Sequence, residues 1–139
     1  MILLVRHAWA GDRSEWEGDD RQRPLDERGR RQAEELVGLL APYEIGRILS
    51  SPYVRCTQTI DPLARVRGLT IEPREELSEE RQADAGAELV LSLESDVAVS
   101  CHGGLSDAVC GRTQKKGEVF VLGLEDGQAR LEGRLRPPS

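Results

Sequence analysis

Cysteine is scarce in this 139-residue chain, and long apolar runs are missing. The three cysteines, Cys56, Cys101 and Cys110, are odd in number and never stand at CxxC spacing. This usage predicts reduced thiols in a cytoplasmic protein and excludes a disulfide framework. No stretch approaches the roughly 20 apolar residues of a membrane span. The first residues also lack the basic flank of a signal peptide, so we expect a cytoplasmic protein with no membrane partner.

Positive charge is in deficit as well. Nineteen lysines and arginines stand against 25 aspartates and glutamates, which gives a formal net charge of −6. A broad nucleic-acid surface is therefore not expected, although a local basic pocket could still bind phosphate. The hydrophobic share of 38% is modest but patterned. With this length, it predicts a single folded domain over residues 1–139.

Strand-like and helix-like segments alternate along the chain. Short branched runs predict strands, and an apolar spacing of three and four predicts helices. The expected strands cover 2–5, 47–49, 69–73 and 97–101. Three helices are expected: one follows Asp26, one runs from a Ser51 cap, with Pro52 at its first position, towards Gly68, and one spans 83–93. The alternation predicts an α/β fold whose mainly parallel sheet carries helices on both faces.

The chain ends differently. Residues 118–135 read as two strands joined at Asp126-Gly127, a favoured hairpin turn, and predict an antiparallel edge at the C-terminal end of the sheet. A long polar loop over 11–24 also breaks the pattern, and loops of this length often border a functional site. Trp9 and Trp16 are expected to pack this loop rather than to stack on a substrate.

Unusual polar residues follow three of the predicted strands. Arg6 and His7 come after the first strand, Arg55 after the second, and His102 and Gly103 after the fourth. Ligands gather beyond the carboxyl ends of parallel strands. Guanidinium groups bind phosphate oxygens bidentately, and a glycine at a helix start lets backbone N–H groups approach an anion. The sequence therefore predicts a phosphate site at this edge.

Two other interpretations of the histidines were weighed. A lone histidine after a strand is usually only a polar residue at the rim, but two of them together with two arginines favour a common site. Zinc is conceivable because Cys101 adjoins His102. Alternation along a strand would turn these neighbours to opposite faces, and no His/Cys pair stands at i, i+4 spacing. We expect no metal.

Five motifs in order resemble one known family. LLVRHAWA, RPLDERGRRQA, SSPYVRCTQT, ELSEE and VSCHGG span residues 2–104. Together they resemble the histidine phosphatase superfamily, which contains phosphoglycerate mutases and small phosphohistidine phosphatases. The stretch WEGDDRQRPLDERG further resembles a bacterial branch in which this domain follows a nudix hydrolase domain, and no such second domain is expected within these 139 residues.

The resemblance implies roles for individual residues. His7 would be the nucleophile and become transiently phosphorylated, while Arg6, Arg55 and His102, with Gly103, would hold the phosphoryl oxygens. The acid that protonates the leaving group would be Glu79, from the pattern Leu77-Ser78-Glu79, although Glu80 stands beside it. The resemblance implies no cofactor.

The resemblance also implies a substrate class. A phosphorylated small molecule, a nucleotide or a phosphohistidine protein would be hydrolysed, and the compact chain favours hydrolysis over mutase activity. Two departures stand out: residues 104–117 are short and polar where relatives carry a longer helix, and Ala10 stands where many members carry threonine. The first departure predicts a shallower pocket. The rival hypothesis is a non-catalytic phosphate-binding or interaction module on the same fold.

Overall fold

The computed structural model describes all 139 residues, and its centre is a single six-stranded sheet. The strands are β1 Ile2–Arg6, β2 Arg47–Ser50, β3 Ile71–Pro73, β4 Val97–Cys101, β5 Val119–Glu125 and β6 Gln128–Leu135. In space their order is β3-β2-β4-β1-β5-β6. The first four strands are parallel, β5 runs antiparallel to β1, and β6 runs antiparallel to β5. The predicted mainly parallel sheet with an antiparallel edge hairpin is confirmed.

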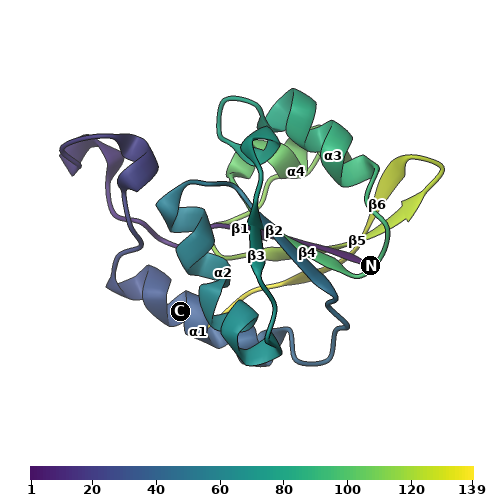
Figure 1. Cartoon of the computed structure of the whole chain (residues 1–139), viewed down its shortest axis with the longest axis horizontal. Helices are drawn as coiled ribbons and strands as arrows, with labels where there is room; N and C mark the ends of the chain where they lie inside the picture. The colour runs from purple at the N-terminus through teal and green to yellow at the C-terminus, as the bar shows by residue number, and fades with distance from the viewer.

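Helices cover both faces of this sheet (Figure 1). They are α1 Glu27–Leu39, α2 Val54–Arg67, α3 Ala87–Leu91 and α4 Gly103–Cys110. Alternate residues of β1 serve two cores, since Leu3 and Val5 pack with residues of α1 and α2, and Ile2 and Leu4 pack with residues of α3 and α4. Each fully buried side chain of this kind contributes about 1.5–3 kcal/mol of transfer free energy. The strand that leads to His7 is thus fixed from both sides.

The predicted helix ends are partly right. Asp26 caps α1, because its carboxylate accepts a hydrogen bond from the Gly29 N–H at 2.8 Å. Gly68 ends α2 in the left-handed conformation, with φ +66°. The predicted Ser51 cap of α2 is wrong, because the Ser51 N–H still bonds to the Ser100 carbonyl at 2.9 Å and prolongs the sheet. The helix begins at Val54, without a side-chain cap.

The expected helix over 83–93 is two pieces. A π-helical turn over Gln82–Gly86 precedes the short α3. Gly86 lies so close to the Glu76 carbonyl that a Cβ would stand 2.7 Å from its oxygen. The third strand is also shorter than predicted. The hairpin turn agrees with its prediction, because Asp126 and Gly127 both have positive φ, at 53° and 73°.

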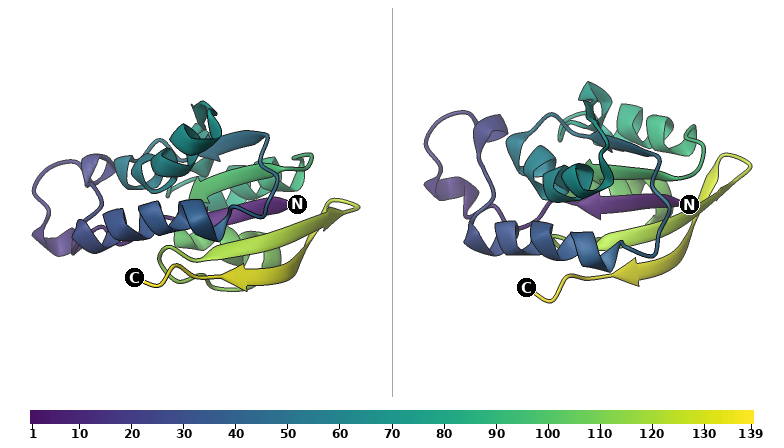
Figure 2. Two further views of the ribbon diagram at one scale, coloured as in Figure 1. Left: turned by 90° about the horizontal axis from the view of Figure 1, so that it is seen from below. Right: turned by 60° about the horizontal axis from the view of Figure 1, so that its bottom comes forward.

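The polar loop over 11–24 projects beyond the carboxyl end of β1 (Figure 2). It contains two short 3-10 turns, Arg13–Glu15 and Asp20–Gln22. The carboxyl ends of the parallel strands β1, β2 and β4 meet at the same edge of the sheet. None of the helices has the length and apolar character needed to cross a bilayer.

Helix α1 touches the backbone that follows the predicted nucleophile, and this contact is testable. A Cβ added at Gly29 would overlap the Trp9 carbonyl oxygen and stand 2.9 Å from its carbon. We expect Gly29→Ala to lower the free energy of unfolding by about 1–3 kcal/mol, since backbone must shift. The measurement is urea denaturation. Gly38→Ala, in the same helix with nothing within 4 Å of the added Cβ, is the control and should be neutral or stabilising. Equal stabilities of Gly29→Ala and the wild type would contradict the close approach.

Candidate active site

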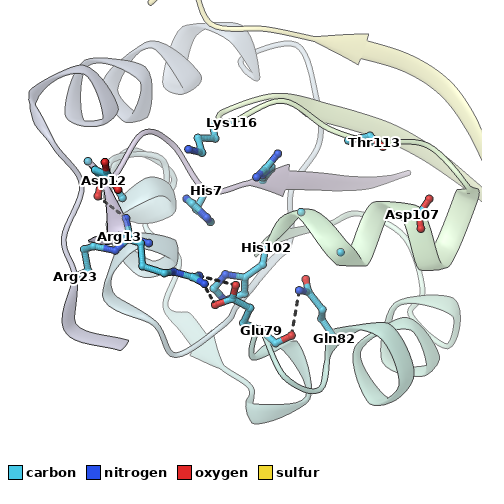
Figure 3. Close-up of a pocket in the computed structure, with 15 residues that line it drawn as sticks. His7, Asp12, Arg13, Arg23, Glu79, Gln82, His102, Asp107, Thr113 and Lys116 are labelled. Atoms are coloured by element: carbon cyan, nitrogen blue, oxygen red, sulfur yellow. Dashed lines mark hydrogen bonds and ion pairs between the residues drawn. The ribbon is translucent and has the colours of Figure 1, made fainter. Parts of the chain in front are cut away.

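A cavity of about 660 Å³ opens at the carboxyl ends of β1 and β4 (Figure 3). The residues that the sequence analysis predicted and that line it are Arg6, His7, Glu79, His102 and Gly103. Both histidines of the chain therefore meet, with their ring centroids 5.5 Å apart. Further cations and carboxylates join them, as described below.

His7 is buried and oriented by its neighbour along the chain. Its Nδ1 lies 2.8 Å from the Ala8 carbonyl oxygen. Because a carbonyl can only accept, Nδ1 carries the proton and Nε2 keeps its lone pair. Burial lowers the pKa of His7 to about 3, and His102, Arg55 and Arg6 add to this effect. Near neutral pH the ring is a neutral imidazole with a nucleophilic nitrogen. Burial, rather than the flanking cations, is the main cause.

His102 is held by the residue that the sequence analysis took for a helix cap. Ser51 Oγ lies 2.9 Å from His102 Nε2 and accepts a hydrogen bond from the Tyr53 N–H at 3.3 Å. Because a hydroxyl can both donate and accept, this contact fixes the orientation of the ring and is compatible with either neutral tautomer. Burial lowers the pKa of His102 to about 3, with a further contribution from Arg55. A neutral imidazole keeps one N–H and can act as a hydrogen-bond donor.

Arg6 reaches the cavity because Gly103 has no side chain. A Cβ at Gly103 would stand 2.9 Å from the Arg6 Cζ. The guanidinium donates from Nη1 to the Gln114 carbonyl oxygen at 2.6 Å. Gln114 is itself buried and donates to the Leu4 carbonyl at 2.7 Å. The glycine after His102 thus serves the packing of Arg6, in addition to starting α4.

Arg55 does not line the cavity. Its side chain is 1% exposed, and its guanidinium donates to the Asp20 carbonyl oxygen at 2.8 Å and carboxylate at 3.0 Å. It also donates to Glu79 Oε2 at 3.1 Å. Asp20 in turn pairs with Arg23 at 2.9 Å. The sequence analysis expected Arg55 at this edge of the sheet as a phosphate-binding residue, and in the structure two carboxylates contact its guanidinium.

The two adjacent glutamates have different surroundings. Glu79 lines the cavity, and Arg13 Nη2 contacts both of its carboxylate oxygens, at 2.7 and 2.9 Å. Glu80 accepts a hydrogen bond from the Tyr53 hydroxyl at 2.7 Å and pairs with Arg21. If a strand extended to Leu77, alternation would turn Glu79 to the same side as Leu77 and Glu80 to the other. This explanation does not apply, because β3 ends at Pro73 and Leu77 closes a 3-10 turn.

Sequence reasoning missed seven side chains of the cavity lining, which include Asp12, Asp107 and Thr113. Arg13 and Arg23 come from the polar loop, Gln82 from the π-helical turn and Lys116 from the segment before β5. The length of the polar loop was the one available signal. The segment after Gly104 was expected to be merely short and polar. Its first half is helix α4, with Leu105 and Val109 buried, and its second half walls the cavity.

The structure also shows which groups the two tryptophans and the cysteine beside His102 contact. The Trp9 ring lies 4.5 Å from the Arg28 guanidinium and 4.3 Å from the Lys116 ammonium group. Trp16 donates from Nε1 to the Asp19 carbonyl at 3.0 Å, within the loop. The Cys101 thiol donates to the Val5 carbonyl at 3.5 Å in the core, on the other side from the cavity that His102 lines. No group of three or more histidine, cysteine, aspartate or glutamate side chains is arranged as a metal site.

Comparison with known proteins places the fold and the motifs in one family. The family description "histidine phosphatase superfamily (branch 1)" matches residues 2–81, and the chain belongs to this superfamily. It is 36% identical to an 8-oxo-(d)GTP phosphatase of Mycolicibacterium smegmatis, over 99% of this chain and 48% of that protein. The chain thus spans about half the length of this relative.

Solved structures share the fold over nearly the whole chain. SixA of Agrobacterium tumefaciens is 26% identical, with a TM-score of 0.78 over 98% of this chain and 97% of its own. A protein histidine phosphatase SixA in complex with tungstate is 22% identical, with a TM-score of 0.82 over 98% of this chain and 96% of its own. These similarities agree with the α/β sheet described above.

Burial of two neutral rings predicts sensitivity to acid. A histidine in the unfolded chain titrates near 6.5, whereas His7 and His102 have pKa values of about 3 in the folded state. Between these values the unfolded chain binds protons that the folded chain does not. The two rings therefore make their full contribution to the free energy of unfolding above pH 6.5, and this contribution is lost as the pH falls towards 3.

We expect a loss of about 1–2 kcal/mol per ring between pH 7 and pH 5, measured by urea denaturation at both values. His7→Gln, which cannot titrate, should reduce the difference between the two pH values. An identical difference in His7→Gln and the wild type would show that the ring is not kept neutral by folding.

Proposed function

We propose that this chain is a phosphatase that works through a phosphohistidine intermediate at His7. The observation that supports the proposal most is the state of that ring. It is 7% exposed, it is neutral, and its proton is fixed on Nδ1 by the Ala8 carbonyl. An unprotonated imidazole nitrogen needs no further activation to attack phosphorus. Arg6 and His102 stand beside it to hold the phosphoryl oxygens.

The reaction takes two displacements. In the first, His7 Nε2 forms a bond to phosphorus, the bond from phosphorus to the leaving oxygen breaks, and Glu79 gives that oxygen a proton. In the second, water gives a proton to Glu79 and attacks the phosphorus of phosphohistidine, the P–N bond breaks with its electron pair returning to Nε2, and inorganic phosphate leaves. Phosphoryl transfer depends mainly on positioning and on stabilisation of charge, which cationic side chains can supply. The proposed steps involve no metal or other cofactor.

Arg55 has a part in this proposal that its present contacts do not show directly. Its guanidinium is occupied by the carboxylates of Asp20 and Glu79. A phosphate dianion is a competing partner of the same charge sign, and bidentate Arg–phosphate pairs are among the strong charge-assisted contacts. We propose that substrate binding replaces at least one of these carboxylates at Arg55.

The proposed substrate is phosphohistidine on a protein or a small phosphorylated metabolite or nucleotide. The names of the relatives support both classes, since one is an 8-oxo-(d)GTP phosphatase and another a protein histidine phosphatase. The rival function is binding of phosphate without catalysis. Hydrolysis of p-nitrophenyl phosphate in the presence of EDTA separates the two, because a binding module would show no turnover.

The nucleophile is tested by His7→Ala. We expect the variant to lose turnover and to keep its fold, because the ring contributes one local hydrogen bond to a strand that is fixed from both sides. Rapid quench in alkaline detergent with a radiolabelled phosphate donor should trap a phosphoenzyme in the wild type only, and this label should be lost on later treatment with acid. Substantial activity in the folded variant would remove His7 from this role.

The acid is tested by Glu79→Gln, with Glu80→Gln as the matched control. General acid catalysis is typically worth about 10²–10⁴-fold and matters most for a poor leaving group. We therefore expect Glu79→Gln to slow hydrolysis of an alkyl phosphate strongly and of p-nitrophenyl phosphate only mildly. The measurement is kcat/KM on both substrates.

The leaving-group dependence distinguishes the possible roles of this carboxylate. If Glu79 serves only as a counter-ion of Arg13 and Arg55, its replacement should affect both substrates equally. If Glu80→Gln alone shows the dependence on the leaving group, the acid is the neighbouring residue.

A further inference from the structure

Two cations of the cavity form no ion pair, Arg6 and Lys116. Arg13 and Arg23 are both paired with carboxylates, those of Glu79 and Asp20. Arg6 donates to the Gln114 carbonyl, whereas the ammonium group of Lys116 makes no hydrogen bond. This ammonium group lies over the face of the Trp9 ring, 4.3 Å from the ring centre. A positive group in a partly buried, cationic place attracts an anion.

Lys116 is held in place by the strand that carries the nucleophile. The N–H of Gly117 donates to the carbonyl oxygens of Arg6 and His7, both at 3.1 Å. Gln32 donates to the Lys116 carbonyl at 3.4 Å and accepts from the Trp9 N–H at 3.2 Å. Gly117 has φ +80°, and a Cβ there would stand 3.0 Å from the Gln32 amide. The backbone of Lys116 is therefore fixed relative to His7.

The position of Lys116 differs from that of the other phosphate-binding candidates. In Figure 3 it lies on the side of His7 away from His102 and Glu79. It lines both the catalytic cavity and a neighbouring one of about 560 Å³, whose wall includes Trp9 and Arg28. Partial burial lowers the pKa of Lys116, Arg6 and Arg23 lower it further, and the Asp26 carboxylate acts in the opposite direction. A bound anion would offset this repulsion.

We propose that Lys116 binds a second phosphate, one attached directly to the phosphoryl group that is transferred, and so selects phosphoanhydride substrates such as nucleoside diphosphates. The inference rests on the phosphatase function proposed above. The three oxygens of the transferred phosphoryl group can be bound by Arg6, Arg55 and His102. Lys116 is not needed to bind this group and is available for a second phosphate. In a phosphoanhydride the second phosphorus is only one oxygen away, which brings its charge into the same cavity. A lysine binds such a group as a compact point charge.

The chemistry of this substrate is balanced without a further reactant. His7 Nε2 bonds to the terminal phosphorus, the bridging P–O bond breaks, and its electron pair stays on the departing phosphate. Lys116 stabilises the negative charge that develops there. Water then cleaves phosphohistidine, so one anhydride and one water give a monophosphate and inorganic phosphate. Because a phosphate leaves more readily than an alkoxide, this substrate depends less on the proton of Glu79.

The test compares kcat/KM for ADP and inorganic pyrophosphate with kcat/KM for p-nitrophenyl phosphate. In Lys116→Met, we expect a loss of about 10–100-fold on the two anhydrides, the equivalent of one charge-assisted hydrogen bond, and a much smaller loss on the monoester. Lys116→Arg should recover most of the loss. Lys115→Met is the control of equal charge, because Lys115 does not line the catalytic cavity, and it should leave all three rates unchanged. Thermal unfolding checks that each variant is folded.

Five results would overturn the proposal. Equal losses on all three substrates would show that Lys116 serves the transferred phosphoryl group, and no loss on any would remove it from binding. Similar selective losses in Lys115→Met would indicate a general effect of surface charge. Turnover of p-nitrophenyl phosphate but of neither anhydride would refute the substrate class and leave the phosphatase function intact. Absence of turnover on all three would refute that function as well.

Discussion

The buried guanidinium of Arg55 is the constraint on which the walls of the cavity depend. A charge with 1% exposure is costly unless it is paired and hydrogen-bonded. Its partners come from two different segments, Asp20 from the polar loop and Glu79 from the region after β3. Arg13 then bridges to Glu79, and so ties the start of the loop to the same region. One buried cation thereby connects two segments that are distant in the sequence.

The same burial sets the chemistry of the histidines. The sheet delivers His7 and His102 from adjacent parallel strands, and the His7 N–H bonds to the Cys101 carbonyl at 2.8 Å. Desolvation keeps both rings neutral, although several guanidiniums stand near them. Neutral imidazole is the form that can attack phosphorus, while the guanidiniums supply the positive charge that the phosphate requires. The protein loses stability in acid because its site keeps both histidine rings neutral for activity near neutral pH.

Local patterns predicted those parts of the molecule that local forces decide. The strands before His7 and His102, the Asp26 cap and the Asp126-Gly127 turn depend on neighbours in sequence, and the structure agrees with the predictions for them. Ser51 obeyed the local rule for a cap, but its backbone pairs with Ser100 and its hydroxyl contacts His102, both about 50 residues away. The cover over Arg55 and the position of Lys116 likewise arise from contacts between distant segments, which no pattern in one sequence window contains.

The division between sheet and loops also separates two tasks. The groups proposed to hold and attack the transferred phosphoryl, Arg6, His7 and His102, lie at strand ends fixed by two cores. Arg13 and Lys116 stand on connecting segments, which vary without loss of the sheet. In a phosphohydrolase of this fold, changes in the loops can therefore alter which leaving group is accepted, while the nucleophile stays the same. Lys116 suits this division, because the N–H of the adjacent Gly117 is shared between the carbonyl oxygens of Arg6 and His7 and fixes the loop relative to the end of β1.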